Sequence, residues 1–137
     1  MAGDLDEWTK EIEVNLRGVM YGTHFAANVM EDEGQGDIVN IGSGSGKSTT
    51  QPWLGYLASK WGVRGFTESS MRDLREEGIR VTHVIPGEVA TAAQPEEDIQ
   101  SMQMLKPADV ADAILYAVSR PDHVCVNELM IIPSGRE

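Results

Sequence analysis

Residues 37–47 read DIVNIGSGSGK, a short apolar segment that runs directly into a Gly- and Ser-rich turn. The segment Asp37–Ile41 is mostly apolar, as expected for a strand that is covered on both faces in a parallel sheet. Along the rest of the chain helical and strand-like patterns alternate, and no internal repeat is present. The sequence therefore predicts an α/β fold with the Gly/Ser run at the carboxyl end of a strand.

The glycines around Lys47 raise the question of a phosphate-binding loop. Such a loop needs the spacing G-x-x-x-x-G-K-[ST], and here its first Gly would fall at residue 41, which is Ile. The residues that follow Lys47, STTQP, are poor helix formers, whereas a phosphate-binding loop opens a helix. We expect Lys47 to lie in solvent, and a nucleotide-phosphate-binding module remains the less favoured alternative.

Three helices and three strands are predicted, in the order α-β-α-β-α-β. The helices are expected from an N-cap at Asp6 to about Met30, from Leu54 to Glu77, and from Pro107 onward, and the strands at 37–41, 79–85 and 128–132. The polar stretch 91–103 predicts a loop of the kind that often covers a site. The expected buried residues are Leu57, Trp61, Phe66, Met71 and Leu74 in the second helix, and Val110, Ile114, Leu115 and Val118 in the third.

Length and composition narrow the class of protein. A chain of 137 residues is expected to form a single domain, 1–137, and its formal net charge of −11 disfavours nucleic acid and anionic membranes as partners. The acidic surface fits an ordinary cytosolic protein or adaptation to high salt. Neither a signal peptide nor a bilayer-length apolar run is seen, which predicts a soluble, cytoplasmic protein. One cysteine and three widely spaced histidines argue against a metal site.

Tyr56 and Lys60 are the first candidates for chemistry. They stand four residues apart on one predicted helix, so their side chains share a face. A nearby ammonium favours tyrosinate and would make the phenol a better proton-transfer group at neutral pH. Ser43 follows the preceding strand, where its hydroxyl could donate to a substrate oxygen. Taken alone, a Tyr-x-x-x-Lys pair is more often a packed Tyr beside a solvated Lys.

Four ordered motifs change this assessment. Residues 56–60, YLASK, match the pattern Y-x-A-S-K, and Ser43 precedes them at the matching spacing. Residues 14–18, VNLRG, and 86–91, PGEVAT, supply the other two motifs. Together they make the chain, over nearly its whole length, resemble the short-chain dehydrogenase/reductase family, which implies a Rossmann-like parallel sheet with flanking helices and NAD or NADP as cofactor.

The resemblance also implies roles for individual residues. Tyr56 would be the acid/base, Lys60 would hold the nicotinamide ribose and lower the pKa of Tyr56, Ser43 would polarise the substrate oxygen, and Asn15 would hold a water next to Lys60. The cofactor-binding set would comprise Tyr56, Lys60, Pro86, Gly87, Val89 and Thr91. Without the motifs, Asn15 would be a polar residue facing water and Thr91 a turn cap.

Part of the family pattern is missing from this sequence. The Gly-rich turn T-G-x-x-x-G-x-G and the segment N-N-A-G are absent, so the fold is expected to be truncated on its N-terminal side, with the strand at 37–41 left as an edge. A fragment, an incompletely represented longer enzyme and a chain completed by a partner all fit. Residues 105–133 resemble the serine and 3-hydroxy acid dehydrogenase branch. The function expected is therefore hydride transfer between a small alcohol and its carbonyl in a homo-oligomer, and the alternative is a non-catalytic oligomerisation or regulatory domain.

Overall fold

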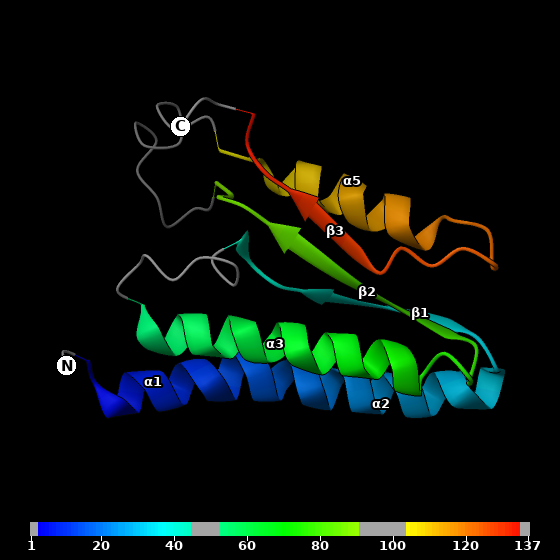
Figure 1. Ribbon diagram of the computed structural model, residues 1–137, viewed down its shortest axis with the longest axis horizontal. Coiled ribbons are helices and arrows are strands. Elements are labelled where there is room, and N and C mark those ends of the chain that lie inside the picture. Colours follow the sequence, from blue (N-terminus) through cyan, green and yellow to red (C-terminus); the bar gives the residue numbers. More distant parts are fainter. Residues whose placement is uncertain (1–2, 45–52, 91–103, 135–137) are drawn as a thin grey trace.

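The computed structural model, which describes residues 3–44, 53–90 and 104–134, contains a three-stranded parallel sheet between two layers of helices (Figure 1). The helical segments α1, η1, α2 and α3 lie on one face of the sheet, and α5 lies on the other. The elements in chain order are α1 (Leu5–Ile12), η1 (Glu13–Arg17), α2 (Gly18–Glu33), β1 (Gly36–Ile41), α3 (Leu54–Asp73), β2 (Ile79–Pro86), α5 (Pro107–Val118) and β3 (Glu128–Ile131). The predicted α/β fold and the order of its elements are confirmed.

The strands lie in the order β1-β2-β3, and both pairs are parallel. Each connection between them passes through a helix, so all three carboxyl ends reach the same edge of the sheet. The N-terminal end of α3 lies at that same side, on the left of Figure 1. Within the described residues, β1 has β2 as its one neighbour, which agrees with the expected edge strand.

The hydrophobic core lies between the sheet and the α2–α3 layer. Ile38 of β1 and Ile79 and Val81 of β2 pack there against Ala27 of α2, and Met30, Met71 and Leu74 border the cluster. These residues come from β1, β2, α2 and the C-terminal end of α3, so the cluster ties both strands to both helices. The central strand β2 is buried over most of its length, because α5 covers its other face.

The first helix differs in detail from the prediction. Its N-cap is Asp4, not Asp6, because a carboxylate oxygen of Asp4 accepts the backbone N–H of Asp6 at 2.9 Å. The helix continues to Glu33, but one five-residue turn of π-helix, η1, interrupts it. Turns of this kind are rare and often occur at functional sites.

The prediction that Trp61 and Leu115 are buried was wrong. Trp61 of α3 is 47% exposed and Leu115 of α5 is 63% exposed. The buried faces of these helices consist largely of small residues, which allow close packing: Gly55, Ser59, Val63, Thr67 and Ser70 with Leu57 in α3, and Ala113 and Ala117 in α5. A search for bulky apolar residues at helical spacing selects the flanks of such faces instead.

An arginine network joins α5 to the opposite end of the sheet. Arg80 of β2 donates through Nε and Nη2 to the two carboxylate oxygens of Asp37 in β1, each at 2.8 Å. Its Nη1 donates to the carbonyls of Arg120 and Val124 at 2.9 and 3.0 Å, beyond the end of α5. The guanidinium thus satisfies carbonyls that the helix leaves unpaired, and it fixes the turn between α5 and β3.

A row of apolar side chains remains exposed on the outer surface of η1 and α2. Val14, Tyr21, Phe25 and Val29 are between 53% and 68% exposed. Tyr21, Phe25 and Val29 are spaced by four residues and therefore share one face of α2, and Val14 lies seven residues before Tyr21 in η1. None of the helices described is long and apolar enough to cross a membrane.

Candidate active site

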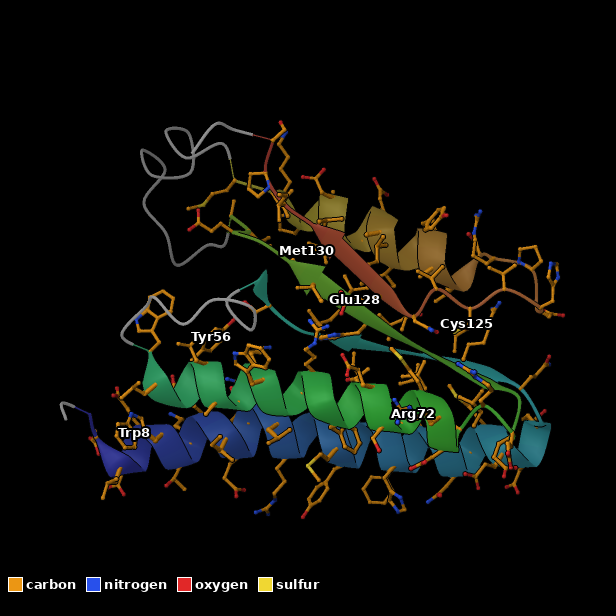
Figure 2. The ribbon with its side chains drawn as sticks, viewed as in Figure 1. Trp8, Tyr56, Arg72, Cys125, Glu128 and Met130 are labelled. Atoms are coloured by element: carbon orange, nitrogen blue, oxygen red, sulfur yellow. The ribbon has the colours of Figure 1, made fainter. Side chains whose placement is uncertain are left out.

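The predicted catalytic pair lies where α3 begins beside the carboxyl end of β1. Figure 2 shows Tyr56 on the first turns of α3, on the side facing the sheet. The Nζ atom of Lys60 lies 5.8 Å from the centre of the Tyr56 ring and donates to the carbonyl of Ile41 at 3.3 Å. Because burial strips water from the ammonium, it lowers the pKa of Lys60 from its ordinary value. The ammonium is therefore held between Tyr56 and the last residue of β1.

Asn15 lies in the middle of the π-helical turn and points toward α3. Its Nδ2 donates to the hydroxyl of Ser59 at 3.2 Å, and that hydroxyl donates to the carbonyl of Tyr56 at 2.7 Å. Ser59 is fully buried. Asn15 is therefore half-buried and attached to the helix that carries Tyr56 and Lys60, in contrast to the alternative in which it faces water.

The close approach of α1 to α3 makes this hydrogen bond possible. A Cβ atom on Gly55 would lie only 2.9 Å from the Cα of Trp8 and would collide with the carboxylate of Glu11. Glycine at this position of α3 is thus required by the contact with the α1 backbone. With the two helix axes this close, the short side chains of Asn15 and Ser59 can meet.

The turns that follow β1 and β2 touch each other at the carboxyl edge. A Cβ atom on Gly44 would lie 3.3 Å from the carbonyl oxygen of Pro86 and 3.4 Å from the Cα of Gly87. Gly87 donates its N–H to Ile131 at 2.7 Å, and Val89 pairs with Leu105 in an isolated parallel bridge. Ser43, directly before Gly44, therefore belongs to the same edge as Pro86 and Gly87.

Some predicted residues lie outside the described ranges. Thr91 is among them, as are Lys47 and the whole of the loop expected at 91–103. Their positions relative to Tyr56 stay predictions.

The sequence patterns did not predict a cluster of buried polar side chains that lies next to the candidate active site. Asn40 of β1 accepts a hydrogen bond from the hydroxyl of Thr23 in α2 and donates one to the hydroxyl of Thr67 in α3, each at 3.2 Å. All three side chains are buried. An Asn in an otherwise apolar strand was the available signal, since a buried amide needs partners. The cluster fixes β1 to both helices two residues before Gly42 and three before Ser43.

Comparison with known proteins places the chain in a family. The family model described as short chain dehydrogenase matches residues 2–101, which is most of the chain. The chain belongs to the short-chain dehydrogenase family. Among curated relatives, uncharacterised oxidoreductases of Staphylococcus aureus (strain USA300) and Staphylococcus saprophyticus are each 36% identical, over 129 and 131 residues.

Solved structures of the family have the same fold. A serine dehydrogenase complexed with NADP+ superposes with a TM-score of 0.86 at 28% identity, over 94% of this chain and 56% of that one. Serine dehydrogenase from Escherichia coli gives a TM-score of 0.81 at 29% identity. The curated relatives are also covered over only 56% of their length, and 94 to 96% of this chain aligns with them. The chain thus spans a little over half the length of the family members it matches.

Proposed function

We propose that this chain supplies the catalytic half of an NAD(P)-dependent oxidoreductase that interconverts a small alcohol and its carbonyl. One observation carries the proposal: Lys60 is held against Tyr56 and bonded to the carbonyl of Ile41, beside the turn that carries Ser43. A solvated surface lysine would not have a lowered pKa and a backbone partner. The arrangement supports the proposal that Lys60 assists Tyr56 in proton transfer.

Tyr56 is the proton donor and acceptor in this proposal. Its hydroxyl gives a proton to the carbonyl oxygen in reduction and takes one from the alcohol in oxidation. The positive charge of Lys60, 5.8 Å from the ring centre, stabilises the phenolate that forms when the proton leaves. The hydroxyl of Ser43 donates to the same substrate oxygen and stabilises the charge that develops there.

Asn15 connects Lys60 to solvent in the proposal. The family resemblance gives it a water that connects the lysine to solvent, and its hydrogen bond to Ser59, the residue before Lys60, supports a fixed position. The buried hydroxyl of Ser59 also holds the carbonyl of Tyr56. Proton exchange at Tyr56 can then be restored from solvent after each turnover.

The residues at this edge fit a nicotinamide cofactor. Among the described residues, the carbonyl of Ile41 is the one acceptor bonded to Lys60, so the remaining N–H donors of the ammonium are available for ribose hydroxyls. Pro86, Gly87 and Val89 would border the nicotinamide, as the contact of Pro86 and Gly87 with the Gly44 turn supports, and Thr91 completes the proposed set. When bound, the nicotinamide supplies or accepts the hydride.

The chemistry of the relatives guides the choice of substrate. One neighbour is a serine dehydrogenase complexed with NADP+, and residues 105–133 resemble that branch. We therefore propose small 3-hydroxy acids, serine among them, as the first substrates to test, with NADP ahead of NAD.

The test is a spectrophotometric assay on a form of the protein extended upstream to the length of its relatives. Formation of NAD(P)H from a 3-hydroxy acid, lost in the Tyr56→Phe variant, would support the proposal. Tight cofactor binding without turnover of any alcohol or carbonyl in a broad panel would favour the regulatory alternative. Tight nucleotide binding that requires Lys47 would favour the phosphate-loop alternative.

We also propose that the protein is a homo-oligomer. The exposed row formed by Val14, Tyr21, Phe25 and Val29 leaves a largely apolar face on the outer helix layer, with the guanidinium of Arg17 over the ring of Tyr21. A second copy related by a two-fold axis presents the same face and can cover it.

A further inference from the structure

A buried histidine lies directly beneath the turn that leads to Ser43. His83 of β2 is 2% exposed. A Cβ atom built on Gly42 would collide with Nε2 of His83 and lie 3.0 and 3.1 Å from Cε1 and Cδ2. The φ angle of Gly42 is not in the left-handed region, so contact with the imidazole is what requires glycine at this position. Neither the sequence motifs nor the proposed chemistry uses His83.

The contact between His83 and Gly42 lies between two residues that the proposed function uses, Ile41 and Ser43. Ile41, whose carbonyl holds Lys60, precedes Gly42, and Ser43 follows it. The N–H of Gly42 donates to the carbonyl of Val84 at 2.8 Å, which fixes the position of the turn relative to β2. The imidazole fills the space that a side chain at residue 42 would otherwise occupy. A displacement of the ring would therefore move the backbone on which both Ile41 and Ser43 depend.

The other side of the ring faces a charge cluster. Residues Asn40, His83 and Glu128 are aligned across the three strands, in register. The Nδ1 of His83 lies 3.9 Å from Oε2 of Glu128, and the same oxygen is 3.0 Å from Nη2 of Arg64 in α3. Arg64 also pairs with Glu68 at 2.9 Å. Glu128 therefore stands between an arginine and a histidine, near the centre of Figure 2.

This cluster opens to a groove between α3 and β3. The groove has a volume of about 250 Å³ and is lined by His83 and Glu128 together with Glu68, Arg72, Arg75 and Asn127. Among the described residues, the charged groups on this side of His83 are thus Glu128 from β3 and, behind it, Arg64, Glu68 and Arg72 from α3 and Arg75 just after that helix, while β1 contributes the neutral amide of Asn40. The carboxylate of Glu128 favours the imidazolium, and burial and the arginines oppose it.

We propose that His83 is a positioning residue for the proposed reaction, which it supports by packing under Gly42 and fixing the Ile41–Ser43 turn. Protonation of the ring, whose Nδ1 lies 3.9 Å from the partly exposed carboxylate of Glu128, shifts it between Glu128 and Gly42 and is transmitted to the turn. The part of the proposal that concerns catalysis rests on the proposed function. The coupling between His83 and Gly42 does not depend on it.

A double-mutant cycle on the chain tests the packing. Gly42→Ala should lower the urea midpoint of unfolding clearly, because its methyl group overlaps the imidazole. In a His83→Ala background the same change should cost less than half as much, because the ring is gone. Thr82→Val, a buried substitution on the other face of β2, is the control background, in which Gly42→Ala should keep its full cost. Equal costs in all three backgrounds would overturn the packing contact.

Nuclear magnetic resonance of the unmutated chain is the first test of the electrostatic coupling, because its result does not depend on whether a variant folds. The amide signals of Gly42 and Ser43 should titrate with the same midpoint as the imidazole of His83. In Glu128→Gln that midpoint should fall, because the imidazolium loses its carboxylate, while Glu31→Gln on the exposed surface of α2 should leave it unchanged. Amide signals that stay constant while His83 titrates, or a ring that does not titrate in the folded chain, would overturn the coupling.

An active, extended form of the protein gives the catalytic readout. His83→Gln should lower kcat with little change in KM for the cofactor, and should remove one step from the pH profile of kcat. An unchanged pH profile in an active enzyme would remove the catalytic part of the inference. A protein with no activity in any variant would refute the proposed function, and the cycle and the titration would still decide whether His83 and Gly42 are coupled.

Discussion

The side-chain amide of Asn15 donates a hydrogen bond to the hydroxyl of Ser59 at 3.2 Å, and that hydroxyl donates to the carbonyl of Tyr56 at 2.7 Å. The bond links the π-helical turn to the helix that carries Tyr56 and Lys60, near the close contact of α1 and α3 that Gly55 allows. Ser59 is thereby the side chain through which two distant parts of the sequence are aligned.

Replacing Ser59 should therefore disturb both stability and the position of Asn15. We expect Ser59→Ala to lower the free energy of unfolding by about 1–2 kcal/mol, because it leaves the amide of Asn15 without its partner. Urea unfolding of the chain measures this. Ser69→Ala, on the exposed side of the same helix, should change the stability by less than about 0.5 kcal/mol. Equal effects of the two substitutions would contradict a specific role for the Asn15–Ser59 bond.

Tyr56→Phe should remove the proton-transfer group and leave the fold intact. In any active form of the protein we expect turnover to fall by roughly two to four orders of magnitude. The ring of Tyr56 stays in contact with Lys60 and Trp53, so the thermal midpoint should hardly change. Tyr116→Phe, on the exposed surface of α5, is the control and should retain full turnover. Near-normal turnover in Tyr56→Phe would sink the assignment of this residue as acid/base.

Much of the fold followed from local signals. The apolar strands at 37–41 and 79–85, the Pro that opens α5 and the glycines that end helices each reflect backbone or packing preferences that act over a few residues. The motifs around Tyr56 and Ser43 placed both at one sheet edge, because carboxyl ends of parallel strands meet there. These preferences need no knowledge of tertiary contacts.

The remaining features depend on contacts between residues far apart in sequence. Neither the Asn15–Ser59 bond nor the ring of His83 beneath Gly42 leaves a periodic signal, because each depends on how closely two elements approach. The exposure of Trp61 and Leu115 has the same origin, since small residues decide which face of a helix is buried. Spacing alone also cannot show that Lys60 is bonded to Ile41.

Substitution of Lys60 should weaken cofactor binding, and substitution of Lys47 should not. Lys60→Ala should weaken cofactor binding and catalysis together, whereas Lys47→Ala should leave nucleotide affinity nearly unchanged, because the spacing around Lys47 does not fit a phosphate-binding loop. Calorimetric titration of both variants in an extended, cofactor-binding form measures this. Because burial lowers the pKa of Lys60, the affinity that depends on its ammonium should be lost as pH rises through that lowered value. Equal losses in the two variants would revive the phosphate-loop interpretation.

The apolar row on η1 and α2 should mediate self-association. We expect light scattering to show a dimer or tetramer at micromolar concentration, and Phe25→Glu to shift it toward monomer because the charge would be buried between two copies. Leu115→Glu, at an equally exposed site on α5, is the control and should leave the assembly unchanged. A monomeric unmutated chain would count against this arrangement, and dissociation by Leu115→Glu alone would move the interface to α5.

Cofactor affinity should depend on a segment that this sequence does not contain. A dinucleotide gains much of its affinity from backbone N–H groups at a Gly-rich turn and a helix N-terminus, and the proposed contacts of Lys60, Pro86 and Gly87 involve only the nicotinamide end. Residues 1–137 alone should therefore bind NADH or NADPH weakly and show little or no dehydrogenase activity. A form extended upstream by strands and a Gly-rich turn should gain both, since that segment would also pair with the side of β1 opposite β2, where the described residues supply no strand. Fluorescence titration of the two forms with each nucleotide decides the matter, and micromolar binding by residues 1–137 would mean that the upstream segment is not needed or that a second copy replaces it.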